Sequence, residues 1–130
     1  ILFLLSCGST STIKSKVTTL KVIDISEYGN VYGIKTINEN TNKENYIVSY
    51  KESYYTENGL SLPVLKNTLE IVKGQSYTFQ LTPLKPRVGQ SQNIGAYIIV
   101  HNDTLLSAEN YTKLPLAFVS QNSIDLLVQE

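Results

Sequence analysis

The 130-residue sequence has one cysteine, Cys7, and neither methionine nor tryptophan. A single cysteine excludes an intramolecular disulfide and a metal site built from several thiolates. Only 17% of the residues are charged, and 11 basic and 11 acidic side chains give a formal net charge of zero. Nucleic-acid-binding domains carry a basic face, so this balance argues against nucleic acid as a partner.

The sequence is also poor in the groups that catalysis requires. His101 is the only histidine, and there is no G-x-S-x-G nucleophile elbow and no phosphate-binding loop. Asp24 lies between two isoleucines, where burial would raise the pKa of its carboxyl group, and Glu27 follows three residues later. Strand residues of this kind usually face water. Because the sequence offers no set of residues that could act together in catalysis, we expect no catalytic residue, no bound metal and no cofactor.

The N-terminus is an apolar run, residues 1–5, too short to span a bilayer, which takes about 20 residues. Leu4-Leu5-Ser6-Cys7 resembles the bacterial lipobox, in which the cysteine thiol carries a lipid. The resemblance implies a signal-peptide remnant (1–6), a polar tether from the acylated, palmitate-bearing cysteine (7–16) and one domain (17–130). No acidic residue follows Cys7 closely, which favours the periplasmic side of the outer membrane. The alternative is an ordinary thiol at Cys7.

The remaining sequence is typical of short strands separated by turns. We expect strands at residues 17–26, 31–38, 46–51, 76–82 and 94–100, with closing segments at 115–119 and 123–128. Tyr77, Phe79 and Leu81 alternate with polar residues and predict one buried face. Gly33 could mark a bulge in the second strand.

Residues 61–74 have two interpretations. Leu62, Leu65, Leu69 and Val72 recur at helical spacing, with Gly74 placed to end a helix. An extended crossing is the alternative. Residues 52–60 and 104–114 are expected to be irregular, and the polar loop at 85–93 could border a binding face.

Three meander strands, a short helix and further strands follow the order of an OB-like five-stranded barrel, within an all-β fold class. A β-sandwich is the alternative. The chain also resembles small lipoproteins of the Bacteroides type over about residues 20–81, through Ile47-Val48-Ser49-Tyr50-Lys51 and through Val72, Gly74, Tyr77, Phe79 and Leu81. That resemblance implies an OB-like domain and no particular activity.

These observations favour a lipid-anchored, non-catalytic binding or assembly module for an envelope protein or glycan. Tyr54 and Tyr55 are the candidate contact residues, because OB barrels bind ligands near their second and third strands. Asp103-Thr104-Leu105 resembles an O-glycosylation motif of Bacteroides-type envelope proteins and makes Thr104 the candidate acceptor. The alternatives are a purely structural accessory subunit and an enzyme that uses Asp24 or Glu27 on an envelope polymer.

Overall fold

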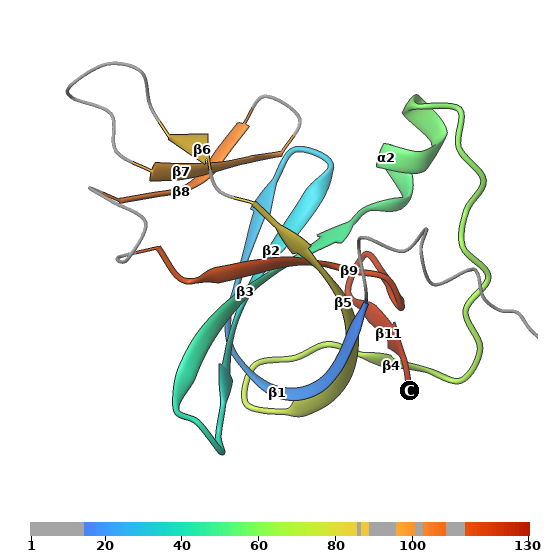
Figure 1. Ribbon diagram of the computed structural model, residues 1–130. Coiled ribbons are helices and arrows are strands. Elements are labelled where there is room, and N and C mark those ends of the chain that lie inside the picture. Colours follow the sequence, from blue (N-terminus) through green and yellow to red (C-terminus); the bar gives the residue numbers. More distant parts are fainter. Residues whose placement is uncertain (1–14, 86, 89–95, 101–102, 109–113) are drawn as a thin grey trace, which may run out of the picture.

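The computed structural model describes residues 15–85, 87–88, 96–100, 103–108 and 114–130. Its centre is a closed barrel of five strands in the order β1-β2-β3-β9-β5, seen end-on in Figure 1. The strands are β1 (Lys16–Tyr28), β2 (Val31–Asn38), β3 (Lys43–Tyr50), β5 (Ser76–Leu84) and β9 (Leu116–Ser120). The pair β3–β9 is parallel and the other pairs are antiparallel. The expected all-β, OB-like barrel is therefore confirmed.

The long first strand closes the barrel by pairing on both sides. Its first half, from Lys16 to Lys21, lies against β5, and its second half lies against β2. The register shifts between Val22 and Asp24 at a β-bulge, which bends the strand from one neighbour to the other. This bulge explains why β1 does not alternate cleanly in sequence. The bulge expected at Gly33 is not there, because β2 pairs with β3 in unbroken register.

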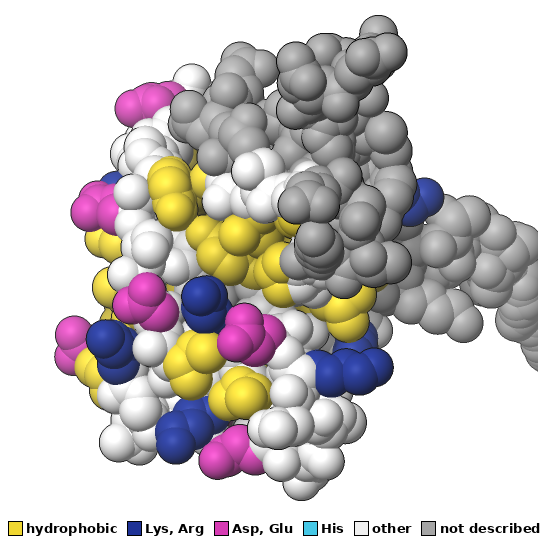
Figure 2. All heavy atoms as spheres, turned by 90° about the vertical axis from the view of Figure 1, so that its left-hand side faces the viewer, with side chains coloured by type: hydrophobic (Ala, Val, Ile, Leu, Met, Phe, Trp, Pro, Cys, Tyr) yellow, Lys and Arg dark blue, Asp and Glu magenta, His cyan; other side chains and the backbone are white. Residues whose placement is uncertain are grey.

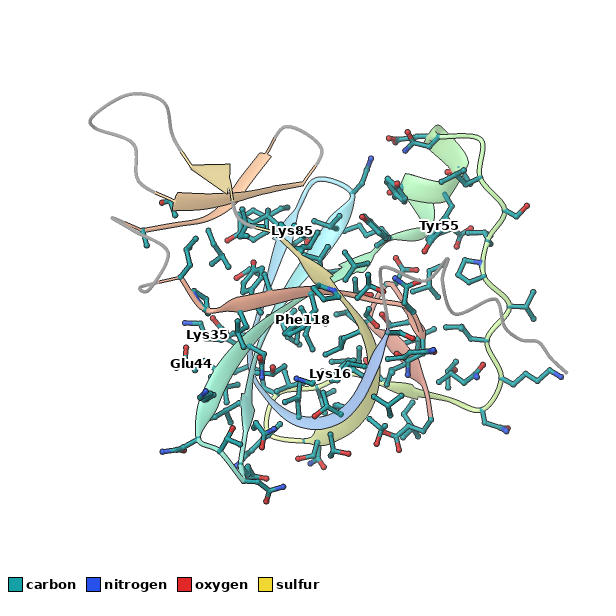
Figure 3. The ribbon with its side chains drawn as sticks, in the orientation of Figure 1. Lys16, Lys35, Glu44, Tyr55, Lys85 and Phe118 are labelled. Atoms are coloured by element: carbon teal, nitrogen blue, oxygen red, sulfur yellow. The ribbon has the colours of Figure 1, made fainter. Side chains whose placement is uncertain are left out.

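The barrel interior is filled by apolar side chains from every barrel strand, from β11 and from the residue that follows β4. They are Leu20, Val22, Ile34, Ile47, Ile71, Tyr77, Phe79, Leu81, Phe118 and Val128. Each fully buried side chain of this size contributes about 1.5–3 kcal/mol to stability. Phe118 lies within the ring of strands, and the Lys16 ammonium is 5.5 Å from its ring centroid (Figure 3). The predicted inward face of Tyr77, Phe79 and Leu81 is confirmed.

The helix between the third and fourth barrel strands lies earlier than expected. Helix α2 covers Glu52–Glu57, where a loop was expected, and residues 61–66 have no regular secondary structure and lead through a bend at Asn67 into strand β4 (Thr68–Glu70). The helical interpretation of residues 61–74 is wrong. Its apolar stripe finds no surface to pack on, since Leu69 is 48% exposed, and Asn67 takes a left-handed φ of 53°.

Strand β4 belongs to a small sheet in the order β10-β11-β4, with β10 (Ser123–Ile124) and β11 (Leu127–Gln129). Asn122 joins this sheet to the barrel. Its Oδ1 accepts from the Gln80 amide at 2.8 Å, and its Nδ2 donates to the carbonyls of Thr78 at 3.0 Å and Gln129 at 2.8 Å. One side chain therefore fixes the turn after β9 against β5 and β11.

A third sheet is inserted between β5 and β9. Its order is β6-β7-β8, with β6 (Arg87–Val88), β7 (Ala96–Val100) and β8 (Asp103–Ala108). Strand β7 was expected, and it is the central strand of this sheet. Strand β8 corrects the expectation of irregular chain at residues 104–108, because its pairing with β7 supplies partners that the local pattern does not reveal. Figure 1 shows the insert at the upper left, beside the ring of barrel strands.

Candidate interaction surface

The outer face of β2 and β3, where OB barrels bind ligands, is covered in this protein by the chain itself. Val31, Tyr46 and Val48 are buried there together with Ile98 of β7 and Leu105 of β8. The insert thus occupies the position that a ligand takes on other OB barrels. On the face shown in Figure 2, charged side chains of both signs surround a group of hydrophobic ones, and no large area carries one sign.

Tyr46 is the polar group within this covered face. Its side chain is 5% exposed, and its hydroxyl has no hydrogen-bond partner of good geometry in the described part of the chain. Burial is the main cause that raises the pKa of Tyr46, and the neighbouring phenol of Tyr28 raises it further. The ring lies over Gly33, where a Cβ atom would come within 1.8 Å of the Tyr46 hydroxyl oxygen.

The predicted contact residues Tyr54 and Tyr55 lie in helix α2 and are half-buried. The Tyr54 ring stacks on Tyr50 with centroids 4.1 Å apart and an interplanar angle of 14°, and Tyr55 meets the Tyr54 ring edge-on at 5.3 Å. Burial, followed by the neighbouring phenols, raises the pKa of Tyr50 and Tyr55. The two residues are therefore brought together, but part of their surface packs against the barrel.

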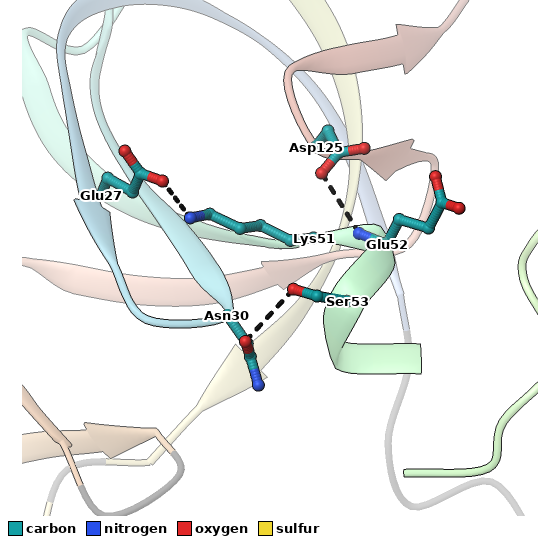
Figure 4. A network of polar contacts seen from close by, with 6 residues as sticks. All are labelled: Glu27, Asn30, Lys51, Glu52, Ser53 and Asp125. Carbon is teal, nitrogen blue, oxygen red and sulfur yellow. Dashed lines mark hydrogen bonds and ion pairs between the residues drawn. The ribbon is translucent and has the colours of Figure 1, made fainter. Parts of the chain in front are cut away.

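A polar network attaches helix α2 to the barrel (Figure 4). The Asn30 side chain donates to Glu57 Oε1 at 2.7 Å and accepts from the Ser53 hydroxyl at 3.2 Å. Asp125 Oδ1 accepts from the Glu52 amide at 3.2 Å, so the first turn of the helix is capped from the turn between β10 and β11. A six-residue helix is marginal alone, and these contacts hold it in place.

The chain after the helix exposes a row of large apolar side chains. We call residues 60–65 the apolar segment. Leu60 is 49% exposed, Leu62 41% and Val64 85%. The three residues alternate with Ser61 and Pro63 along the chain. Of the eight exposed large hydrophobic residues in the described part of the chain, five lie in residues 60–72.

The main chain of the apolar segment is held at its two ends. The Leu60 amide donates to the Tyr55 carbonyl at 2.8 Å, and the Lys66 amide donates to Gln129 Oε1 at 2.7 Å. Residues 61–65 make no main-chain hydrogen bond within the described chain. The segment therefore crosses the surface as an anchored, extended stretch, visible to the right of α2 in Figure 1.

A shallow apolar groove of about 230 Å³ lies between the barrel and the insert. Its lining residues come from the end of β5, from β7 and from the start of β9: Pro83, Leu84, Ile98, Leu114, Pro115, Leu116, Ala117 and Phe118. None of the described residues that line it is charged, so this part of the groove lacks the convergent polar groups that orient a small-molecule ligand.

The two carboxylates considered for catalysis do not converge in a pocket. The Asp24 side chain is 57% exposed and lies 3.7 Å from Lys73 Nζ. The Glu27 side chain is 61% exposed and pairs with Lys51, whose ammonium also lies over the Tyr32 ring. Asp24 therefore faces water, as expected for such a strand residue, and it lies directly after the bulge in β1.

Several candidates lie at or beyond the limits of the described chain. Cys7, His101 and most of the polar loop at 85–93 are outside the described residues, and Thr104 lies in β8 opposite Ile99 without a described side chain. Among the described residues, no group of three potential metal ligands is found. No helix in the same ranges is both long and apolar enough to span a membrane.

Sequence reasoning did not find the apolar segment or the covered barrel face. The alternation of Leu60, Leu62 and Val64 about Pro63 was a signal for an exposed extended chain, but the overlapping helical spacing obscured it. No family model matches this chain, and no curated protein or solved structure is similar to it at a significant level.

Proposed function

We propose that this chain is a lipid-anchored envelope protein whose OB-like barrel is a non-catalytic binding or assembly module for another envelope protein. The observation that carries the proposal is the exposed row of Leu60, Leu62 and Val64. Gathered apolar side chains on a soluble domain mark interaction sites. A protein partner fits better than a glycan, since the side chains of Leu60, Leu62 and Val64 are wholly apolar.

The anchor in this proposal is the lipid on Cys7, with the domain facing the periplasm from the outer membrane. Its support is Leu4-Leu5-Ser6-Cys7 followed by a polar tether. The test is the intact mass of the protein extracted from its native membrane, beside a Cys7→Ala variant. A product that begins at Cys7 and carries two or three acyl chains supports the anchor. An unacylated product that retains the Cys7 thiol contradicts it.

The docking surface is tested separately with a photo-reactive residue in place of Val64. Asn40 is the matched control, since it is also exposed but lies at the tip of the β2–β3 hairpin, away from residues 60–72 in sequence. We expect protein adducts at Val64 and few at Asn40. Equal labelling at both positions, or lipid adducts alone, would contradict the proposal.

The predicted modification of Thr104 is tested by measuring the intact mass of a Thr104→Ala variant extracted from the native membrane. This variant should lose any sugar mass that the unaltered protein carries.

A structural accessory subunit remains the second candidate, because an apolar surface and a shallow groove also suit a protein that only completes an assembly. Deleting the partner distinguishes the two: a structural subunit loses its own stability in the membrane, whereas a binding module persists. The third interpretation, an enzyme that uses Asp24 or Glu27, gains no support, because both side chains are exposed and lie in no pocket of the described chain.

A further inference from the structure

We propose that Asn58-Gly59, at the end of helix α2, is a site of spontaneous modification, in which the Asn58 amide becomes a carboxylate and the helix is loosened. This inference goes beyond the proposed function and does not rest on it. The pair is the only Asn-Gly in the sequence. Both reacting groups belong to this chain, and the only co-reactant is water.

The reaction joins groups of the two neighbouring residues. The Gly59 nitrogen attacks Asn58 Cγ and forms a new C–N bond. The bond between Cγ and Nδ2 breaks, and Nδ2 leaves as ammonia with the proton of the Gly59 nitrogen. The product is a five-membered cyclic imide. Water then opens this ring at either of its two carbonyl carbons, which gives aspartate or an isoaspartate whose main chain runs through Cγ.

The end of helix α2 leaves the reacting groups accessible. Asn58 and Gly59 are both exposed. Gly59 has a left-handed φ of 66°, the conformation in which glycine commonly ends a helix. A Cβ atom at this position would meet no atom of the described chain within 4 Å, apart from its chain neighbours. The residue that the helix end favours is therefore also the one that shields its own nitrogen least.

The folded chain does not hold these groups in the geometry of attack. Asn58 has a ψ of 8°, so the Gly59 nitrogen nearly eclipses the Asn58 nitrogen and is turned away from the side chain. Asn58 Nδ2 donates to the Tyr54 carbonyl at 2.7 Å, which holds the side chain against the helix. The reaction therefore requires the last turn of α2 to open. Frayed ends of secondary structure open at little cost in free energy, and a helix this short is marginal alone.

The new carboxylate opposes the contacts that end the helix. It replaces the Nδ2 donor beside the Tyr54 carbonyl and follows the carboxylate of Glu57 in sequence. Carbonyl groups at a helix C-terminus carry partial negative charge, so an added anion is unfavourable there. The same turn includes the bond from the Leu60 amide to the Tyr55 carbonyl. Modification of Asn58 therefore loosens one of the two ends by which the apolar segment is held.

The experiment incubates the full-length chain in neutral buffer and in urea, and follows each asparagine by peptide mass spectrometry. Conversion replaces the mass of an amide by that of an acid, and isoaspartate resists an endoprotease specific for aspartate. Asn40, which is exposed and followed by threonine, is the internal control. In urea we expect conversion at Asn58 at least tenfold faster than at Asn40, and Gly59→Ala should remove most of this difference.

In neutral buffer the folded chain should convert Asn58 at least threefold more slowly than the chain in urea, yet faster than Asn40. A rate no greater than that of Asn40 would overturn the site. Equal rates in the two solutions would overturn the control by the helix. Asn30→Ala removes the bonds to Glu57 and Ser53 without touching Asn58, and it should speed conversion severalfold in the folded chain. An unchanged rate in this variant would also contradict the control by the helix.

Hydrogen exchange tests the effect of the product on the helix. Asn58→Asp represents the product, and Asn58→Ala is the matched control that loses the donor without gaining a charge. We expect the Leu60 amide to exchange at least tenfold faster in Asn58→Asp than in the unaltered chain, and faster than in Asn58→Ala. Unchanged exchange in β5 shows that the barrel is intact. Equal exchange of the Leu60 amide in the two variants would overturn the effect of the charge.

Discussion

The phenol ring of Tyr46 lies directly over Gly33 on the neighbouring strand, in the space that a Cβ atom would occupy. A Cβ at residue 33 would lie 1.8 Å from the Tyr46 hydroxyl oxygen and 2.6 Å from its Cζ. Gly33 has no positive φ and pairs regularly with Val48, so it is needed for close packing and not for an unusual backbone angle. Tyr46 in turn belongs to the buried apolar cluster that joins this face to Ile98 of the insert.

Gly33→Ala should lower the free energy of unfolding, because overpacking a close-packed site costs about 1–3 kcal/mol. Urea denaturation measures the loss. Tyr46→Phe should not rescue the variant, since the ring carbon at 2.6 Å remains, whereas Tyr46→Leu should reduce the penalty of the alanine. Equal penalties in all three backgrounds would contradict the packing role of Gly33.

Stability should fall in alkaline solution. The folded protein holds the Tyr46 phenol protonated above its ordinary pKa of 10.0, because of burial and then the Tyr28 phenol, and the unfolded chain does not. The unfolded state therefore binds fewer protons above pH 10.0, and the free energy of unfolding decreases as pH rises through that range. Below that pH range, the contribution of Tyr46 to the free energy of unfolding does not change with pH. The raised pKa values of Tyr50 and Tyr55 also make the free energy of unfolding decrease in alkaline solution.

The Tyr46→Phe variant isolates this effect. Its free energy of unfolding should decline less steeply above pH 10.0 than that of the unaltered chain. At neutral pH it should be equal or higher, because an unpartnered buried hydroxyl costs about 1–3 kcal/mol. Parallel declines in the two proteins would assign the alkaline instability to other groups.

Asn122→Ala should destabilise the connection between the barrel and the β10-β11-β4 sheet. The change removes the bonds to the Gln80 amide and to the carbonyls of Thr78 and Gln129. Leaving such groups unpaired costs about 1–3 kcal/mol each where water cannot reach them, so we expect a loss of about 2 kcal/mol or more by thermal or urea denaturation. Gln121→Ala is the control, because its exposed side chain bonds only the Thr82 hydroxyl. Similar losses in both would contradict the role of Asn122.

Replacing Tyr54 and Tyr55 with serine should weaken capture of a native partner and also lower stability. Stacking of Tyr54 on Tyr50 is worth about 0.5–1.5 kcal/mol beyond buried area. A Tyr54→Phe, Tyr55→Phe variant keeps the rings and separates the two effects. Capture assays at matched folded fractions should give loss with serine and retention with phenylalanine. Unchanged capture by the serine variant would remove both tyrosines from the contact surface.

The sequence predicted most strands of the barrel because their residues alternate against a common interior. Tyr77, Phe79 and Leu81 are an example: their face is buried in the barrel whatever lies beyond it. The meander of β1, β2 and β3 could also be predicted from the sequence, since polar turns such as 38–43 separate the strands. Lipidation at Cys7 and its consequences also come from the sequence alone and remain predictions.

Helix α2 could not be located from local pattern. Its six residues carry no buried side chain, and its first turn is capped by Asp125, which lies far along the chain. The apolar spacing at residues 61–74 is stronger in sequence, yet those residues find no surface on which a helix could bury its stripe. Tertiary contacts therefore decided which segment became helical.

The sequence by itself determined the barrel strands and the character of their inward faces, because alternation and turn chemistry are local properties. Only the tertiary structure decided that the insert covers the outer face of β2 and β3 and that Leu60, Leu62 and Val64 stay exposed. Each outcome depends on contacts between residues distant in the chain. Burial and exposure at these positions are set by what packs across from them, which the local pattern does not contain.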